Sequence, residues 1–214
     1  MHKVLTTLVF VFISAMAKAE PLRITAFGDS LVHGYGLNTD QGLVPQLERW
    51  MNDNGADVVL TNAGVSGDTT AGGAARIDWT LSDNPQGLIV LLGGNDLLRG
   101  MQADRAKANL SAILSAAQAQ DVEVLLIGMQ APGNFGPDYK AEFDAIYSDL
   151  AAEHDTLLFK DAFAGISAQV SGDPVAAQRY LQSDGIHPNA EGVVLNVAAL
   201  GPVALELVAR ISNP

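Results

Sequence analysis

Three residues of this sequence have the types and the spacing that nucleophilic catalysis requires. Asp184 lies three residues before His187 in the turn-forming stretch DGIHPN, so its carboxylate can reach Nδ1 of the imidazole and leave Nε2 free. A serine hydroxyl becomes an effective nucleophile only when an imidazole held in this way takes its proton. Ser30, in the segment GDSL, is the candidate nucleophile.

The other histidines are weaker candidates for the general base. His2 lies in an N-terminal segment that we expect to be removed. His154 lies near a predicted helix end, where a surface position that favours the helix dipole is the expected one. His33 lies three residues after Ser30, at the rim of the expected site, but no carboxylate is placed to orient it. We therefore assign the base to His187.

Each of these signals is weak when it is taken alone. A D-x-x-H pattern before a helix is more often a structural turn, with Asn189 capping the helix that follows. Ser30 could close a strand or cap a helix, and the glycine-rich stretch around Gly67 could be only a tight turn. Asn95 is a common turn former. Their meaning depends on whether the fold brings them to one place.

Short apolar segments alternate with helical patterns along the chain. Segments bounded by Gly, Asn or Asp, which suit buried strands, span residues 23–27, 58–61, 88–92, 124–127 and 156–159. Amphipathic helical patterns cover residues 43–51, 106–117, 143–150 and 193–208, and Gly201-Pro202 could kink the last of them. This alternation predicts an α/β fold, a three-layer α/β/α sandwich around a five-stranded parallel sheet of the flavodoxin-like type.

Unusual polar clusters follow four of the predicted strands directly. They occupy residues 28–31, 62–68, 93–96 and 128–136. Parallel strands end at one edge of a sheet, and ligands bind at that edge. The sequence therefore predicts a single crevice to which Ser30, Gly67 and Asn95 all contribute.

These motifs resemble the four blocks of the SGNH, or GDSL, hydrolase family, and they occur in the family's order. The blocks are GDSL at 28–31, the loop around Gly67, GND at 94–96 and D-x-x-H at 184–187. The flanking stretches are similar to those of a bacterial exported subgroup with arylesterase, thioesterase and lysophospholipase activity. They are NAGVSGDT at 62–69, LLGGNDLLRG at 91–100, and GNFG at 133–136 with Tyr139.

The resemblance implies a role for each matching residue. Ser30 would attack the carbonyl carbon of an ester, and His187 would act first as base and then as acid. Asp184 would orient His187 and stabilise the imidazolium. The backbone N–H groups of Ser30 and Gly67 and the side-chain amide of Asn95 would form the oxyanion hole, since an oxyanion needs preorganised donors.

Two aspartates lie beside these residues, and one position departs from the subgroup. We expect Asp29 and Asp96 to brace loops by accepting backbone N–H bonds rather than to react. Leu97 stands where a glycine is expected. That departure bears on the mobility of the loop after Asn95 and not on the class of reaction.

Several other kinds of chemistry do not fit the sequence. The nucleophile elbow G-x-S-x-G of the α/β-hydrolases is broken, because Val32 stands where the second glycine belongs. The chain has no cysteine, which excludes thiol catalysis, zinc fingers and iron–sulfur clusters. It contains neither H-E-x-x-H nor a phosphate loop of the form G-x-x-x-x-G-K-[ST]. We expect no metal and no cofactor.

The loops that flank the expected site are apolar, which bears on the substrate. The candidate substrate contacts are Leu97, Leu98, Met101, Phe135, Tyr139 and Ile186. An apolar rim suits an acyl chain or an aryl group better than a sugar. We expect a small acyl ester or a lysophospholipid as substrate, with thioesterase activity as a capability. A carbohydrate O-acetylesterase of the same fold and a non-catalytic binding module are the alternatives.

The N-terminal segment has the anatomy of a secretory signal peptide. A basic start is followed by an almost wholly apolar run at 4–16 and by the small residues of Ala17-Lys18-Ala19. The apolar run is too short to span a bilayer. We expect cleavage of residues 1–19 near Ala19, a single catalytic domain at 20–214, and a periplasmic or secreted protein.

The charge of the chain limits its partners. Its 24 acidic residues outnumber 12 basic ones, which gives a formal net charge of −12. Such a surface repels nucleic acid and anionic membranes. We expect a monomer without a stable membrane span and without a nucleic-acid partner.

Overall fold

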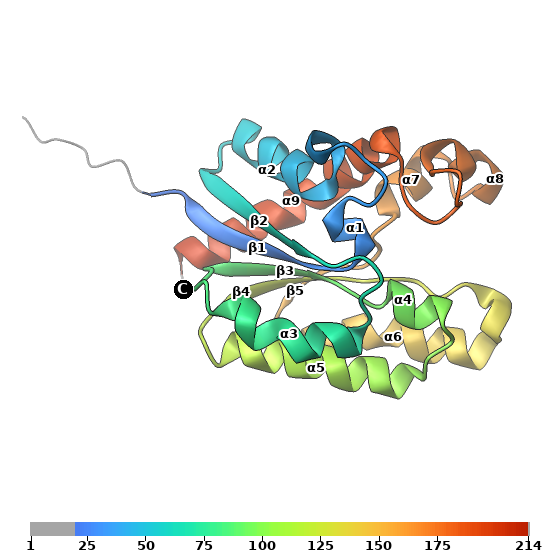
Figure 1. Cartoon of the computed structure of the whole chain (residues 1–214), viewed down its shortest axis with the longest axis horizontal. Helices are drawn as coiled ribbons and strands as arrows, with labels where there is room; N and C mark the ends of the chain where they lie inside the picture. The colour runs from blue at the N-terminus through green and yellow to red at the C-terminus, as the bar shows by residue number, and fades with distance from the viewer. Residues whose placement is uncertain (1–19, 214) are drawn as a thin grey trace, which may run out of the picture.

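Five parallel strands form the sheet of the computed structural model, which describes residues 20–213 (Figure 1). They lie side by side in the order β2, β1, β3, β4, β5. Their bounds are Leu22–Gly28 (β1), Val58–Gly64 (β2), Gly87–Leu91 (β3), Glu123–Ile127 (β4) and Leu157–Phe159 (β5). The five predicted strands are confirmed, whereas the signal peptide expected at residues 1–19 lies outside the described residues.

The register of the central strands brings their carboxyl ends to one level. Gly28, the last residue of β1, pairs with Gly64 of β2 and with Leu91 of β3. All five residues of β3 are buried, as expected for a strand that is covered on both faces. The loops after β1, β2 and β3 therefore leave the sheet at the same edge.

Helices cover both faces of the sheet, so the predicted three-layer architecture is confirmed (Figure 1). One face carries α1 (Ser30–His33), α2 (Leu43–Asp53), α7 (Ala164–Gln169) and α9 (Ala190–Ser212). The other carries α3 (Thr70–Leu81), α4 (Gly94–Leu98), α5 (Ala103–Gln118) and α6 (Pro137–Glu153). Short turns complete the chain: α8 (Pro174–Ala177) and the 3₁₀ segments η1 (Thr39–Gln41), η2 (Gly133–Phe135) and η3 (Gln178–Tyr180).

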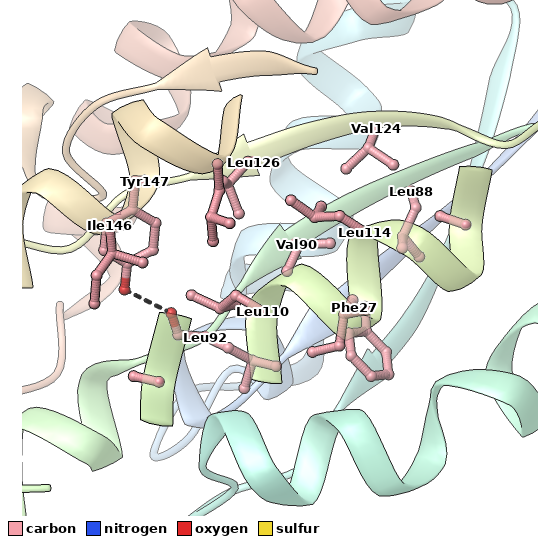
Figure 2. Close-up of a cluster of buried hydrophobic side chains, with 14 of the residues drawn as sticks. Phe27, Leu88, Val90, Leu92, Leu110, Leu114, Val124, Leu126, Ile146 and Tyr147 are labelled. Atoms are coloured by element: carbon pink, nitrogen blue, oxygen red, sulfur yellow. Dashed lines mark hydrogen bonds between the residues drawn. The ribbon is translucent and has the colours of Figure 1, made fainter. Parts of the chain in front are cut away.

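Each face of the sheet has its own apolar core. Figure 2 shows the core under α5 and α6, in which Phe27 and Leu88 of the sheet join Leu110 and Leu114 of α5. The buried hydroxyl of Tyr147 donates to the carbonyl oxygen of Leu92 over 2.8 Å, so this polar group is satisfied. The core on the opposite face is formed mainly by Ile24, Ile89, Leu125, Leu47, Leu200 and Leu207.

Helix α3 was not among the helices that the sequence predicted. Gly72 and Gly73 lie in its first turn, and each glycine disfavours a helix by about 1 kcal/mol relative to alanine. The fold uses Gly73 because a Cβ atom there would collide with the side chain of Leu92. Close packing of α3 on the sheet therefore overrides the low helix propensity of its sequence.

The last helix, α9, continues past Pro202 and runs from Ala190 to Ser212 as one element. Gly201 allows a close crossing with α2, because a Cβ atom there would collide with the ring of Trp50. Among the described residues, α9 is the helix that is long and apolar enough to cross a membrane, with a mean hydropathy of 1.9. It packs against α2, β4 and β5, as a helix of the domain core does.

The surface position expected for His154 is wrong. Its ring is buried, with Nε2 3.0 Å from Ser111 Oγ and Nδ1 2.9 Å from Gln118 Oε1. The side chain of Gln118 also donates to the carbonyl oxygen of His154 over 2.8 Å. His154 follows the end of α6 on the side that faces α5, and it therefore joins the two helices.

Candidate active site

Ser30 lies at the carboxyl end of β1, where the chain turns sharply into α1. Asp29 caps this short helix, because its Oδ1 accepts the N–H of Leu31 over 3.0 Å. Gly28 is required just before the turn, since a Cβ atom there would collide with the carbonyl group of Leu91 on the neighbouring strand. The turn places Oγ of Ser30 at 2.8 Å from Nε2 of His187.

His187 is held by the aspartate that precedes it by three residues. Nδ1 of the imidazole lies 2.7 Å from Oδ2 of Asp184. Oδ1 of Asp184 accepts the backbone N–H groups of Ile186 at 2.9 Å and of His187 at 3.0 Å. The hydrogen bond from the His187 side chain, followed by these two backbone bonds, lowers the pKa of Asp184 to about 2. A carboxylate at Nδ1 selects the tautomer in which Nε2 can accept the proton of Ser30.

The turn that carries His187 is also the N-terminus of α9. Asn189 caps the helix by accepting the N–H of Gly192 over 3.0 Å, and its side-chain nitrogen donates to the carbonyl of Arg179 over 2.8 Å. The ring of Tyr35 packs against that of His187, with 4.8 Å between their centroids. The structural turn and the oriented histidine are therefore one feature, and the first does not exclude the second.

Ser30, Gly67 and Asn95, the predicted oxyanion donors, line one crevice. The backbone N–H groups of Ser30 and Gly67 have no hydrogen-bond acceptor within residues 20–213. Gly67 has a φ of 84°, a conformation that favours glycine. The side-chain nitrogen of Asn95 lies 3.4 Å from Oδ2 of Asp29, and the amide has a second N–H to offer.

An arginine of α3 fixes the loop that carries Gly67. Nε of Arg76 lies 2.7 Å from Oδ2 of Asp68, the residue after Gly67. Its two terminal nitrogens donate to the carbonyl oxygens of Ala63 at 2.9 Å and Gly28 at 2.8 Å. One guanidinium group therefore ties the ends of β1 and β2 to the Gly67 loop. This role of Arg76 could not be predicted, because α3 itself was not predicted.

The loop after Asn95 is fixed from both sides. Asp96 is fully buried and accepts the N–H of Thr70 at 2.9 Å and its hydroxyl at 2.7 Å. Arg99 donates to the carbonyl oxygen of Gly67 over 2.9 Å and so bridges the two loops that carry predicted oxyanion donors. Leu97, the departure from the subgroup, is only 5 % exposed and belongs to the core. Its side chain anchors α4.

Asp29 and Asp96 both accept backbone N–H bonds, which confirms that they brace their loops. Asp29 also has an unusual titration. Burial raises the pKa of Asp29 to about 6, although the bond from the N–H of Leu31, the nearby charge of His187 and the amide of Asn95 all act in the opposite direction. The two aspartates beside Ser30 and His187, Asp29 and Asp184, are therefore shifted in opposite directions.

The crevice above Ser30 has a volume of about 490 Å³ and a largely apolar lining. Four of the six predicted substrate contacts line it: Leu97, Leu98, Phe135 and Ile186. Further apolar residues that the prediction did not include also line it, namely Tyr35, Met129, Pro132 and Phe163. Met129 and Pro132 lie in the loop after β4, so the position of that loop was a signal that could have identified them.

Met101 and Tyr139 do not line this crevice. The hydroxyl of Tyr139 donates to the carbonyl oxygen of Met101 over 2.8 Å, and its ring packs 5.2 Å from that of Phe135. The two residues support the wall behind Phe135. Met101 lies in the loop between α4 and α5, whereas Tyr139 lies in the first turn of α6 and not in a loop. The spacing could not show which way their side chains point. Within residues 20–213 no cluster of three His, Asp or Glu side chains is arranged to hold a metal ion.

The fold and these loops define an acyl hydrolase of the three-layer α/β/α type, and comparison with known proteins specifies the family. Residues 26–194 match the GDSL-like Lipase/Acylhydrolase family, and the chain therefore belongs to that family. The expected resemblance is confirmed, and the protein is a carboxylic-ester hydrolase of the SGNH group.

Individual relatives agree with this assignment. Esterase TesA of Pseudomonas aeruginosa is 38 % identical over 85 % of this chain and 86 % of its own length. Thioesterase 1/protease 1/lysophospholipase L1 of Escherichia coli is 34 % identical over 82 % of this chain and 78 % of its own. The crystal structure of AlinE4, an SGNH-hydrolase family esterase, superposes with a TM-score of 0.71 at 39 % identity, and covers 92 % of this chain and all of that one.

Proposed function

We propose that the protein hydrolyses acyl esters through a covalent acyl-enzyme on Ser30. The observation that carries the proposal is the continuous pair of hydrogen bonds from Asp184 through His187 to Ser30, 2.7 Å and 2.8 Å long. This is the arrangement in which a base can take the serine proton while a third group holds the base in place.

The reaction begins when Nε2 of His187 takes the hydroxyl proton of Ser30. Oγ forms a bond to the carbonyl carbon, and the oxyanion accepts hydrogen bonds from the N–H groups of Ser30 and Gly67 and from the amide of Asn95. His187 then gives its proton to the departing alcohol as the ester bond breaks. Water repeats these steps on the acyl-enzyme and releases the acid.

The lining of the crevice supports an apolar acyl or aryl group as the part of the substrate that binds there. Leu98, Phe135 and Ile186 offer exposed carbon surface, and the crevice of about 490 Å³ has room for a medium-length chain. Relatives named esterase, arylesterase and lysophospholipase favour the same substrates. We propose lysophospholipids and short to medium acyl esters as substrates, with thioesters as a further capability.

The proposal includes export and a monomeric state. The basic and apolar segment at 1–19 supports a periplasmic or secreted protein that starts near Glu20. The mass and N-terminal sequence of the protein recovered from outside the cytoplasm test this part. A protein that keeps residues 1–19 would contradict it.

The activity is tested by labelling the folded protein with a fluorophosphonate and by measuring hydrolysis of p-nitrophenyl esters from acetate to decanoate. We expect label on Ser30, none in Ser30→Ala, and activity that extends beyond acetate. Activity confined to acetate would favour a carbohydrate O-acetylesterase. Failure to label the folded wild-type protein would favour a binding module.

A further inference from the structure

A second, smaller cavity adjoins Ser30 and His187, and we call it the inner cavity. Its volume is about 40 Å³, and its walls are mainly apolar: Leu31, Leu43, Leu91, Phe163 and Val193, with Asn196. Ser30 and His187 line both the inner cavity and the crevice. Gly67 and Asn95 line the crevice but not the inner cavity. The crevice and the inner cavity therefore meet at Ser30 and His187, and the proposed oxyanion donors Gly67 and Asn95 lie on the crevice side.

Asn196 of α9 brings a polar group into this apolar wall. The residue is only 6 % exposed, and its Oδ1 accepts the N–H of Ile166 over 3.1 Å. That bond identifies which end of the carboxamide is the oxygen. The NH₂ group has no acceptor within residues 20–213. This NH₂ group is therefore free to donate to an ordered water or a ligand in the adjoining space.

We propose that the inner cavity holds the water that completes hydrolysis, and that Asn196 is the positioning residue for this water. The inference rests on the proposed function. One water needs a cavity of about 10–15 Å³ and two to four polar partners. Ser30, His187 and Asn196 provide three polar side chains around a space of about 40 Å³.

The position of the inner cavity suits the second half of the reaction. In the acyl-enzyme, an apolar chain that fills the crevice displaces solvent from that side of Ser30. Water in the inner cavity gives a proton to Nε2 of His187 while its oxygen bonds to the acyl carbon. The bond between that carbon and Oγ then breaks, the proton passes from His187 to Oγ, and the acid leaves.

The dimensions and polarity of the inner cavity favour water over an arm of the substrate. Its volume of about 40 Å³ suits a few waters and is less than a tenth of the crevice volume of about 490 Å³. An alkyl group would also leave the NH₂ of Asn196 against carbon, which is unfavourable for a buried donor. Water satisfies this group and fits the space.

The test uses Val193→Phe, which fills the inner cavity from α9. Val194→Phe is the matched control, because Val194 is the next residue, is 52 % exposed and does not line the cavity. Release of p-nitrophenol is followed through the first turnover and the steady state, and intact-protein mass spectrometry detects acyl-Ser30. We expect Val193→Phe to form the acyl-enzyme at the wild-type rate. Its steady-state turnover should be slower by about tenfold or more, and acyl-Ser30 should accumulate.

Two outcomes would overturn the inference while the esterase proposal stands. Unchanged turnover in folded Val193→Phe would show that the inner cavity has no part in the reaction. Equal slowing of the first turnover and the steady state would assign the cavity to an arm of the substrate. A wild-type protein with neither esterase activity nor acyl-enzyme would refute the proposed function instead.

Asn196→Asp provides a second test should Val193→Phe not fold. The substitution keeps an oxygen for the N–H of Ile166 and replaces the NH₂ donor by an acceptor. We expect acyl-enzyme to accumulate again. Deacylation loses the donor that positions its water, whereas acylation does not use this donor. Equal effects on both rates would contradict a role in placing water.

Discussion

The two halves of the candidate active site are built differently, although they meet at Ser30. The acid–base half is one largely exposed turn, in which Asp184 contacts residues no more than three positions away. The oxyanion half, around Gly67 and Asn95, depends on contacts between distant parts of the chain, and Arg76 alone reaches back 48 positions to Gly28.

Because the two halves are built differently, substitutions in them should have different effects on catalysis and on folding. A change in the acid–base turn removes a catalytic group but leaves the cores on either side of the sheet intact. A change in the oxyanion half disturbs buried polar groups that also hold strand ends and helices together. The first should therefore affect chiefly the rate, and the second should affect both rate and stability.

The largest expected effect belongs to the group where the halves meet. Ser30→Ala should lower kcat by about 10⁴- to 10⁶-fold, the scale on which serine triads depend on their nucleophile. The free energy of unfolding should change little, because within residues 20–213 the side chain of Ser30 bonds only to His187. Steady-state kinetics and urea unfolding measure the two effects. His33→Ala is the control, and a comparable loss there would remove His187 as the base.

Asn95→Ala should have the next largest effect. Loss of one oxyanion donor typically lowers kcat by about 10²- to 10³-fold. The loss should appear in kcat more than in KM, because the bond strengthens as charge develops on the substrate oxygen. Ester hydrolysis under saturating conditions measures it. A loss of less than about threefold would mean that Asn95 only shapes its turn.

Arg76→Ala should chiefly lower the stability of the fold. The substitution breaks an ion pair with Asp68 and leaves the carbonyl groups of Gly28 and Ala63 without this donor. We expect the free energy of unfolding to fall by about 2–4 kcal/mol. Urea unfolding measures it against Arg105→Ala, an exposed arginine that should change stability by less than about 0.5 kcal/mol. If the two substitutions lowered the free energy of unfolding equally, the oxyanion half would not depend on the distant contacts of Arg76.

The two aspartates should give stability opposite dependences on pH. The folded protein holds the Asp29 proton up to a pKa of about 6, whereas the unfolded chain releases it near 3.8. The free energy of unfolding should therefore fall, by up to about 3 kcal/mol, as the pH rises through this window. Asp184 has a folded pKa of about 2, so the stability that it contributes is present above pH 3.8 and is lost as the pH falls toward 2.

Asp29→Asn and Asp184→Asn, followed by urea unfolding between pH 3 and 7, test this pair. Asp29→Asn keeps an oxygen for the N–H of Leu31 and should gain stability relative to the wild type as the pH rises. Asp184→Asn should be less stable than the wild type above about pH 4, and this difference should shrink as the pH falls toward 3. Plots of the free energy of unfolding against pH that stay parallel to that of the wild type would contradict the pKa shifts of both aspartates.

The acid–base half could be predicted because its information is local. Asp184 and His187 share one turn, and their spacing alone indicates the contact between them. Ser30 could be added because parallel strands end at a common edge, which is a property of the fold class. The five strands were predictable for a similar reason, since short apolar segments bounded by turn residues suit strands that are buried on both faces.

The braces of the oxyanion half could not be predicted, because they depend on packing that the sequence does not display. Arg76 lies in a helix with two glycines in its first turn, and only the packed structure shows that a Cβ atom would collide with Asp68 at Gly72 and with Leu92 at Gly73. His154 resembles a surface residue at a helix end until α5 is packed against it. Tyr139 lies in the first turn of α6, and its hydroxyl bonds to the carbonyl of Met101 instead of lining the crevice.

Asn189 links the general base to the interior of the protein. It caps α9, and α9 packs against α2, β4 and β5. The exposed turn of Asp184 and His187 is therefore continuous with one of the most deeply packed helices of the chain. Heating should consequently abolish activity and melt the domain at the same temperature, without an earlier phase in which the base is displaced and the fold survives.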